Sequence, residues 1–170
     1  DSRWLDAVSS VDTFLSDLTS SPMDEAVALI TYADGARVDQ PLTKEYWRIG
    51  DKLAGESASL DGGGTNIASG LQAGEAALAT ALSRDFAARV VVILTDGKRS
   101  VGSNPIYWAE SLAENGVMVI AVTFSDEADQ ATMKKVAEIG NGFHVHATNR
   151  QDLKNAFRAI GNRLPTLLTR

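Results

Sequence analysis

The chain has 170 residues, of which 44% are hydrophobic and 22% charged, and it contains no cysteine. This length and composition are typical of a single globular α/β domain with its own core. The net charge of −6 argues against nucleic-acid binding, because phosphates demand a basic surface. The lack of cysteine excludes disulfides and thiolate metal sites, and no apolar run approaches the length of a membrane span.

The first part of the sequence predicts a helix followed by a hairpin. Apolar residues recur three and four positions apart over residues 3–19, which is one face of a helix. A β-rich apolar run over 27–32 predicts a strand, and Asp34-Gly35 is a hairpin signal. The returning strand, 36–42, is more polar and contains Pro41, which places it at the edge of a sheet.

The rest of the sequence alternates between helices and strands. The segment 89–95 contains the continuous apolar run Val-Val-Val-Ile-Leu, which is typical of a strand buried on both faces of a parallel sheet. The other expected elements are helices over 44–53, 66–82, 105–114 and 129–139, strands over 117–124 and 143–147, and a last helix capped by Asn149. We therefore expect an α/β fold, a doubly wound and mostly parallel sheet with helices on both faces and one antiparallel edge strand.

Two short loops carry the strongest signal for function. The run Gly62-Gly63-Gly64-Thr65-Asn66 opens a helix, and Asp96-Gly97 directly follows the buried strand. In doubly wound folds, ligands bind beyond the carboxyl ends of the strands. The Thr65 hydroxyl and the Asp96 carboxylate are oxygen ligands of the kind that Mg²⁺ prefers. We identify Thr65 and Asp96 as candidate metal ligands.

Each of these residues also has an ordinary structural interpretation. Thr65 is a favoured residue for capping the following helix, and Asp96 can be a solvated residue of an Asp-Gly turn. Asp61, in the same loop as Thr65, is a weaker candidate and fits a turn former. The glycine run lacks the Lys of a phosphate-binding loop, which argues against nucleotide binding.

A pair of histidines is the other possible site. His144 and His146 alternate on a short strand and so face the same side. Two such residues can bind zinc, but no third ligand is evident nearby, and we interpret them as ordinary residues of an edge strand.

The order of these motifs resembles a von Willebrand factor type A (VWA) domain over nearly the whole chain. The segments that carry the resemblance are, in order, RWLDAVSSVDTFLSDL, EAVALITYADGARVDQPLT, GGGTNIASGLQAGEAAL, VVVILTDGK, GVMVIAVTFSD and GFHVHATNRQDLKNAFRAIGNRL. The tail FRAIGNRLPTLLTR also resembles bacterial VWA proteins of the Tad/Flp pilus-assembly type, which is a weaker match.

The resemblance implies a metal-ion-dependent adhesion site that holds Mg²⁺ (or Mn²⁺ or Ca²⁺). In the family, a first loop Asp-x-Ser-x-Ser supplies direct ligands, a second loop supplies a Thr and a third an Asp. The last two positions correspond to Thr65 and Asp96. An Asp or Glu carboxylate of a partner protein completes the metal shell, so the resemblance implies protein binding and not catalysis.

The sequence departs from the family at the first loop. Asp-x-Ser-x-Ser is absent, and so is the apolar strand before it, which would lie between 27–32 and 89–95. Losing a central strand costs more than the roughly 5–15 kcal/mol that a domain has in hand. We expect residues 1–170 to be a single, N-terminally incomplete VWA-like domain, without a bound metal for lack of this loop. The alternatives are a strand from another chain or a fold rearranged around the gap.

We expect the domain to be a protein-binding or adhesion module of a bacterial surface, secreted or pilus-assembly protein, outside the cytoplasm. One alternative is a metal-independent structural scaffold, for which Asp96 is dispensable. Another is a nucleotide-binding or hydrolytic enzyme of the doubly wound class, but no general base near Asp96 is evident in the sequence.

Overall fold

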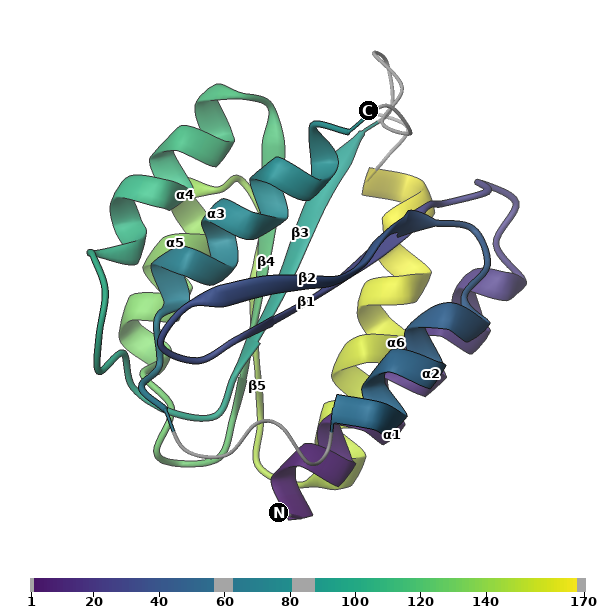
Figure 1. Cartoon of the computed structure of the whole chain (residues 1–170), viewed down its shortest axis with the longest axis horizontal. Helices are drawn as coiled ribbons and strands as arrows, with labels where there is room; N and C mark the ends of the chain where they lie inside the picture. The colour runs from purple at the N-terminus through teal and green to yellow at the C-terminus, as the bar shows by residue number, and fades with distance from the viewer. Residues whose placement is uncertain (1, 57–62, 81–87, 168–170) are drawn as a thin grey trace.

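The computed structural model describes residues 2–56, 63–80 and 88–167. Helices and strands follow one another in an α/β order (Figure 1). Among the described residues, no helix is both long and apolar enough to cross a membrane. The elements are α1 (Ser2–Thr19), β1 (Val27–Tyr32), β2 (Ala36–Thr43), α2 (Trp47–Glu56), α3 (Ile67–Leu78), β3 (Arg89–Thr95), α4 (Pro105–Glu114), β4 (Val117–Phe124), α5 (Gln130–Ile139), β5 (His144–Ala147) and α6 (Arg150–Leu167).

A three-stranded parallel sheet in the order β3-β4-β5 forms the centre of the domain. Helices α3, α4 and α5 lie on one side of it, and α1, α2 and α6 lie on the other (Figure 1). Seven of the eight residues of β4 are buried, as expected for a strand covered on both faces. The predicted alternation after residue 89 and the helices on both faces are confirmed.

Strands β1 and β2 form a separate antiparallel hairpin. Tyr32 pairs with Ala36 across the turn, and the ladder is irregular between Val27 and Ile30. Pro41 lies in β2 and is exposed, so the prediction of an antiparallel edge strand is confirmed.

The sheet is interrupted between β1 and β3. The described part of the chain has no ladder between these two strands. A cleft of about 1010 Å³ separates them, lined by apolar residues of α1, β1, β3 and α6. Every residue of β1 is half-buried, and so are Val90, Val92 and Leu94 of β3. The gap that the sequence predicts is therefore present, and the sheet has not closed around it.

The two sides of the cleft touch at one end. The Tyr32 hydroxyl, at the carboxyl end of β1, donates a hydrogen bond of 2.8 Å to the Leu94 carbonyl, at the carboxyl end of β3. The two strands therefore end at the same edge of the domain, as neighbours in a parallel sheet do. Loss of hydration at its hydroxyl raises the pKa of Tyr32, which keeps this donor protonated.

Several element boundaries differ from the prediction for local reasons. Helix α2 begins at Trp47 and not at 44, because the Thr43 hydroxyl accepts a hydrogen bond of 3.0 Å from the Glu45 amide and forms a turn there. Helix α3 ends at Leu78 and not at 82. Asn149 caps α6 as predicted, accepting a bond of 2.9 Å from the Asp152 amide.

Candidate metal centre

The structure brings the two candidate ligand loops together at the edge where β3 ends. The Thr65 amide donates a bond of 2.7 Å to the Ser100 hydroxyl, and the Ser100 amide donates one of 3.1 Å to the Thr65 carbonyl. A Cβ atom placed on Gly97 would lie 3.7 Å from the Thr65 hydroxyl oxygen, which puts this hydroxyl beside the Asp96-Gly97 turn. Thr65, Asp96 and Arg3 all line the same end of the cleft.

Thr65 does not cap α3. The cap is Asn66, whose side-chain oxygen accepts a bond of 3.0 Å from the Ser69 amide. The Thr65 hydroxyl makes no hydrogen bond with the described residues, and the residue is half-buried. The capping interpretation of Thr65 is therefore wrong, since the next residue takes that role, and its hydroxyl is available to a ligand.

The glycines before Thr65 allow a close approach of the β1–β2 turn. A Cβ atom on Gly64 would lie 2.8 Å from an Asp34 carboxylate oxygen and 2.7 Å from a Val101 methyl group. The Gly64 amide donates to the same carboxylate, and Asn66 donates a bond of 2.8 Å to the Asp34 carbonyl. Asp34, which the sequence indicates only as a hairpin residue, thus holds the Thr65 loop in place. Asp61 and Gly62 lie outside the described residues.

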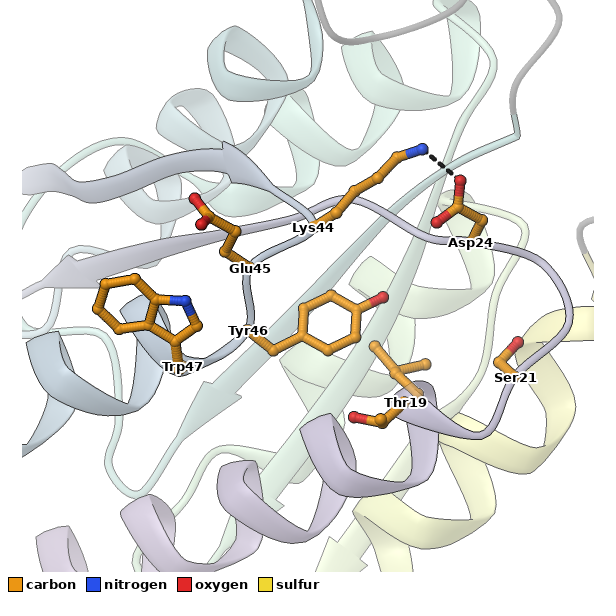
Figure 2. A pocket seen from close by; sticks show the side chains of 8 residues that line it. Thr19, Ser21, Asp24, Lys44, Glu45, Tyr46 and Trp47 are labelled. Carbon is orange, nitrogen blue, oxygen red and sulfur yellow. Dashed lines mark hydrogen bonds and ion pairs between the residues drawn. The ribbon is translucent and has the colours of Figure 1, made fainter.

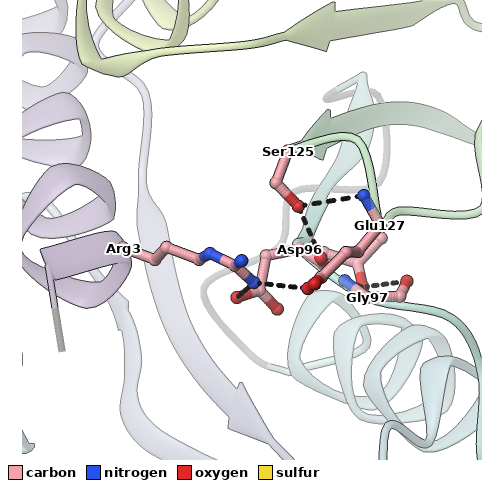
Figure 3. A network of polar contacts seen from close by, with 6 residues as sticks. Arg3, Asp96, Gly97, Ser125 and Glu127 are labelled. Carbon is pink, nitrogen blue, oxygen red and sulfur yellow. Dashed lines mark hydrogen bonds and ion pairs between the residues drawn. The ribbon is translucent and has the colours of Figure 1, made fainter.

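A network of polar contacts surrounds Asp96 (Figure 3). The Ser125 hydroxyl donates a bond of 3.0 Å to the Asp96 carbonyl, and Ser125 has a positive φ of 78° in the turn after β4. One guanidinium nitrogen of Arg3 lies 3.7 Å from an Asp96 carboxylate oxygen and 2.9 Å from one of Glu127. The hydrogen bond from Arg3 to Glu127, the charge of Glu127 and, more weakly, Asp96 raise the pKa of Arg3. The Asp96 side chain remains 51% exposed.

Sequence reasoning missed Arg3, Ser125 and Glu127. Arg3 and Glu127 are 124 positions apart, so no local pattern connects them. For Ser125, the sequence did contain a usable signal, because this residue directly follows the predicted strand β4 just as Asp96 follows β3. Loops after neighbouring parallel strands meet at one edge of the sheet.

The two histidines form a separate cluster on β5. His144 Nε2 and His146 Nδ1 lie 2.8 and 2.9 Å from the buried Thr123 hydroxyl, so they face the same side as predicted. Gln130 lies 3.3 Å from the other ring nitrogen of His146. The described residues contain no group of three or more His, Cys, Asp or Glu suited to a metal ion.

A smaller cavity of about 420 Å³ lies between the end of α1 and the start of α2 (Figure 2). Its charged residues include Lys44 and Asp24, which form an ion pair with each other. Exposed Trp47 lies at its rim, with the Arg48 guanidinium stacked 4.8 Å from the ring centre.

Comparison with known proteins identifies the family. The family model of the von Willebrand factor type A domain matches residues 1–159. The chain belongs to the VWA domain family. A curated relative, the uncharacterized protein YwmC of Bacillus subtilis, is 30% identical over 70 residues, which are 41% of this chain and 31% of that protein. The chain thus spans less than a third of the length of this relative.

Solved structures support the VWA fold. The conserved hypothetical protein BatB of Bacteroides thetaiotaomicron has a TM-score of 0.82 at 18% identity, over 99% of this chain and 89% of that one. The vWF domain of the type V pilus tip protein Mfa5 of Porphyromonas gingivalis has a TM-score of 0.73 at 13% identity, over 99% and 90%. Proximal thread matrix protein 1 of the mussel byssus, with a zinc-occupied MIDAS motif, has a TM-score of 0.74 at 18% identity, over 91% and 42%.

The residues at the edge of this VWA domain fit part of a divalent-cation site. A hydroxyl and a carboxylate are hard oxygen donors, and the Thr65 hydroxyl has no competing partner among the described residues. A positive group, the Arg3 guanidinium, already stands against Asp96. Two oxygen donors do not fill the near-octahedral shell of Mg²⁺, so further ligands have to come from water and from elsewhere.

Proposed function

We propose that this VWA domain binds a partner protein through a divalent cation at the edge where β3 ends. Thr65 and Asp96 each give one oxygen ligand to Mg²⁺, Mn²⁺ or Ca²⁺, and water completes part of the shell. When bound, the cation supplies a positive charge that an Asp or Glu carboxylate of the partner can bind. The role of the chain's own residues is to hold these two oxygens in adjacent, cross-bonded loops.

The observation that supports this proposal best is the pairing of the two ligand loops through Thr65 and Ser100. Two hydrogen bonds fix the backbone of Thr65 against the loop after β3, while its hydroxyl remains unused by the described residues. Asp34 accepts a hydrogen bond from the Thr65 loop, and Ser125 donates one to the Asp96 carbonyl in the loop after β3. Such prior positioning lowers the entropy cost of binding a cation.

We also propose that residues 1–170 are one VWA domain that is N-terminally incomplete. A β-strand between β1 and β3 would fill the cleft, and a loop after it would bring further oxygen ligands to Asp96. The first turn of α1 supports this arrangement, because Arg3 lies beside Asp96, where a strand parallel to β3 would end. The buried indole nitrogen of Trp4, which lines the cleft, has no hydrogen-bond partner in the described structure and would gain one.

We propose an extracytoplasmic place for the domain, in a bacterial surface, secreted or pilus-assembly protein. Support comes from the likeness of the fold to the pilus tip protein Mfa5 and from the resemblance of the tail to pilus-assembly VWA proteins. Binding, and not catalysis, is the role we infer, because VWA domains are generally interaction modules.

Binding of Mn²⁺ to the 170-residue chain tests the proposal. The relaxation rate of water protons reports how much Mn²⁺ is bound. Because water can take the places of the absent first-loop ligands, we expect weak but saturable binding, which Asp96→Ala weakens about tenfold or more and Thr65→Val weakens as well. Asp51→Ala is the matched control, because it removes the same charge from an exposed position on α2. Binding unaffected by Asp96→Ala would overturn the metal proposal, and a partner that still binds Asp96→Ala would favour the metal-independent scaffold.

A further inference from the structure

Arg3 lies close enough to Asp96 for its positive charge to repel a cation that binds Asp96. Its guanidinium bridges two carboxylates from two different loops, at 3.7 Å from Asp96 and 2.9 Å from Glu127. We call these two contacts the Arg3 bridge. Arg3 belongs to the first turn of α1, so the bridge ties this helix to the turns that follow β3 and β4 (Figure 3).

The two halves of the bridge differ in strength. The contact with Glu127 is a hydrogen bond of 2.9 Å, whereas the contact with Asp96 is an ion pair at 3.7 Å, beyond hydrogen-bond distance. The guanidinium can therefore leave Asp96 and keep its stronger partner. Glu127 is itself joined to the Asp96 turn, because its amide donates a bond of 3.3 Å to the Ser125 hydroxyl, which in turn donates to the Asp96 carbonyl.

We propose that the Arg3 guanidinium neutralises the Asp96 carboxylate when no metal is bound, and that a divalent cation competes with Arg3 for this carboxylate. When the cation binds Asp96, the guanidinium leaves Asp96 and stays hydrogen-bonded to Glu127. The inference rests on the proposed function, since it concerns the regulation of the same site. The affinity of the site for a cation then depends on a residue of α1, a helix that carries no proposed metal ligand. The Arg3 guanidinium and a cation bound at Asp96 repel each other, so each lowers the affinity of Asp96 for the other.

The affinity for Mn²⁺ of the 170-residue chain and its Arg3 variants tests this competition. We expect Arg3→Gln to bind Mn²⁺ about fivefold or more tightly than the parent. Arg3→Lys keeps the charge and should stay closer to the parent. Lys98→Gln is the matched control, because it removes one positive charge from the exposed loop after Asp96, and no ion pair of Lys98 is found among the described residues.

A second variant separates the bridge from a general effect of charge. Glu127→Gln removes the other partner of Arg3, so the guanidinium should hold Asp96 more firmly and weaken Mn²⁺ binding. In the Arg3→Gln background the same change should have no further effect, whereas a Glu127 that ligates the metal, or acts only by charge, would weaken binding in both backgrounds. Unchanged melting temperatures in the metal-free variants confirm that each is folded.

The outcomes distinguish the two proposals. Tighter binding by Arg3→Gln, with a smaller change in Lys98→Gln, supports the Arg3 bridge. Equal or weaker binding by Arg3→Gln, or an equal gain in Lys98→Gln, overturns the bridge and leaves the metal site standing. No Mn²⁺ binding by the parent or by Arg3→Gln overturns the proposed function, and the inference falls with it.

Discussion

The Tyr32 hydroxyl donates a hydrogen bond of 2.8 Å to the Leu94 carbonyl across the interrupted sheet. A carbonyl in the middle of a sheet is normally bonded to the next strand, and here a side chain has taken the place of that strand. The contact fixes the carboxyl ends of β1 and β3 next to each other, at the edge where Thr65 and Asp96 lie. The candidate metal centre therefore keeps its framework although the sheet is open.

Tyr32→Phe should destabilise the chain by about 1 kcal/mol, because the Leu94 carbonyl loses its donor and the ring keeps its packing. Urea unfolding of the two proteins would measure the difference. Tyr107→Phe is the matched control, since Tyr107 is 68% exposed and should change stability little. Equal unfolding midpoints for Tyr32→Phe and the parent would mean that this bond contributes nothing to holding the edge together.

Gly64→Ala should destabilise the chain by about 1–3 kcal/mol and weaken Mn²⁺ binding. The added methyl group would lie within 2.8 Å of Asp34 and 2.7 Å of Val101, so the Thr65 loop has to move away from the β1–β2 turn. Gly35→Ala, in that turn, meets nothing within 4 Å and serves as the control. If both variants unfold at the same urea concentration, the close approach at Gly64 is not required for the loop.

Stability should fall when the pH drops below 6.5, the ordinary pKa of histidine. Burial first, and then the charges of His146 and Lys134, lower the pKa of His144 in the folded protein. The unfolded chain therefore takes up this proton more readily, so stability is full above the ordinary pKa and is lost as the pH falls through the lower, folded one. Thr123, which contacts both rings, has no charge to offset the loss.

Urea unfolding at about pH 7.5 and pH 5 measures this loss, and His144→Gln should make it smaller. The lowered pKa values of two carboxyl groups affect stability only in a more acidic pH range. The hydrogen bonds from Thr132 lower the pKa of Asp129, and those from Thr148 lower that of Asp152, so their contributions disappear only below the ordinary carboxyl value of 3.8. If the parent and His144→Gln lose the same stability between about pH 7.5 and pH 5, the loss comes from groups other than His144.

Hydrogen exchange should be fast on one edge of β3. The Leu94 carbonyl faces β1, and peptide groups point to alternate sides along a strand, so we expect the amides of Val90, Val92 and Leu94 to face the cleft. They should exchange faster than those of Val91 and Ile93, which face β4 in the ladder. In a longer protein that carries the proposed strand, the three amides should become protected. Equal protection in the two proteins would mean that nothing enters the cleft.

The sequence predicted the parts of the fold that depend on local pattern. The continuous apolar run of β3 and the alternation after it placed the parallel sheet correctly, and the polar run with Pro41 placed the edge strand. The position of Asp96 after a buried strand also placed it at the edge of the sheet. These features follow from periodicity and from strand ends, which are visible along the chain.

The remaining features of the site depend on contacts that are distant in sequence. Asn66 and not Thr65 caps α3. The sequence could not decide between them, because both residue types are favoured caps and only the backbone geometry selects one. The contacts of Asp34 with Gly64 and of Arg3 with Glu127 depend on how the hairpin and α1 lie against the sheet. No spacing in the sequence encodes that placement, so these residues were missed.

Anomalous X-ray diffraction from crystals of the protein soaked in Mn²⁺ would test the metal centre most directly. We expect a manganese peak within bonding reach of both the Thr65 hydroxyl and the Asp96 carboxylate, at about 2.0–2.1 Å, with the Arg3 guanidinium turned toward Glu127. A peak elsewhere, or an Asp96 that still pairs with Arg3 in the presence of saturating Mn²⁺, would contradict it.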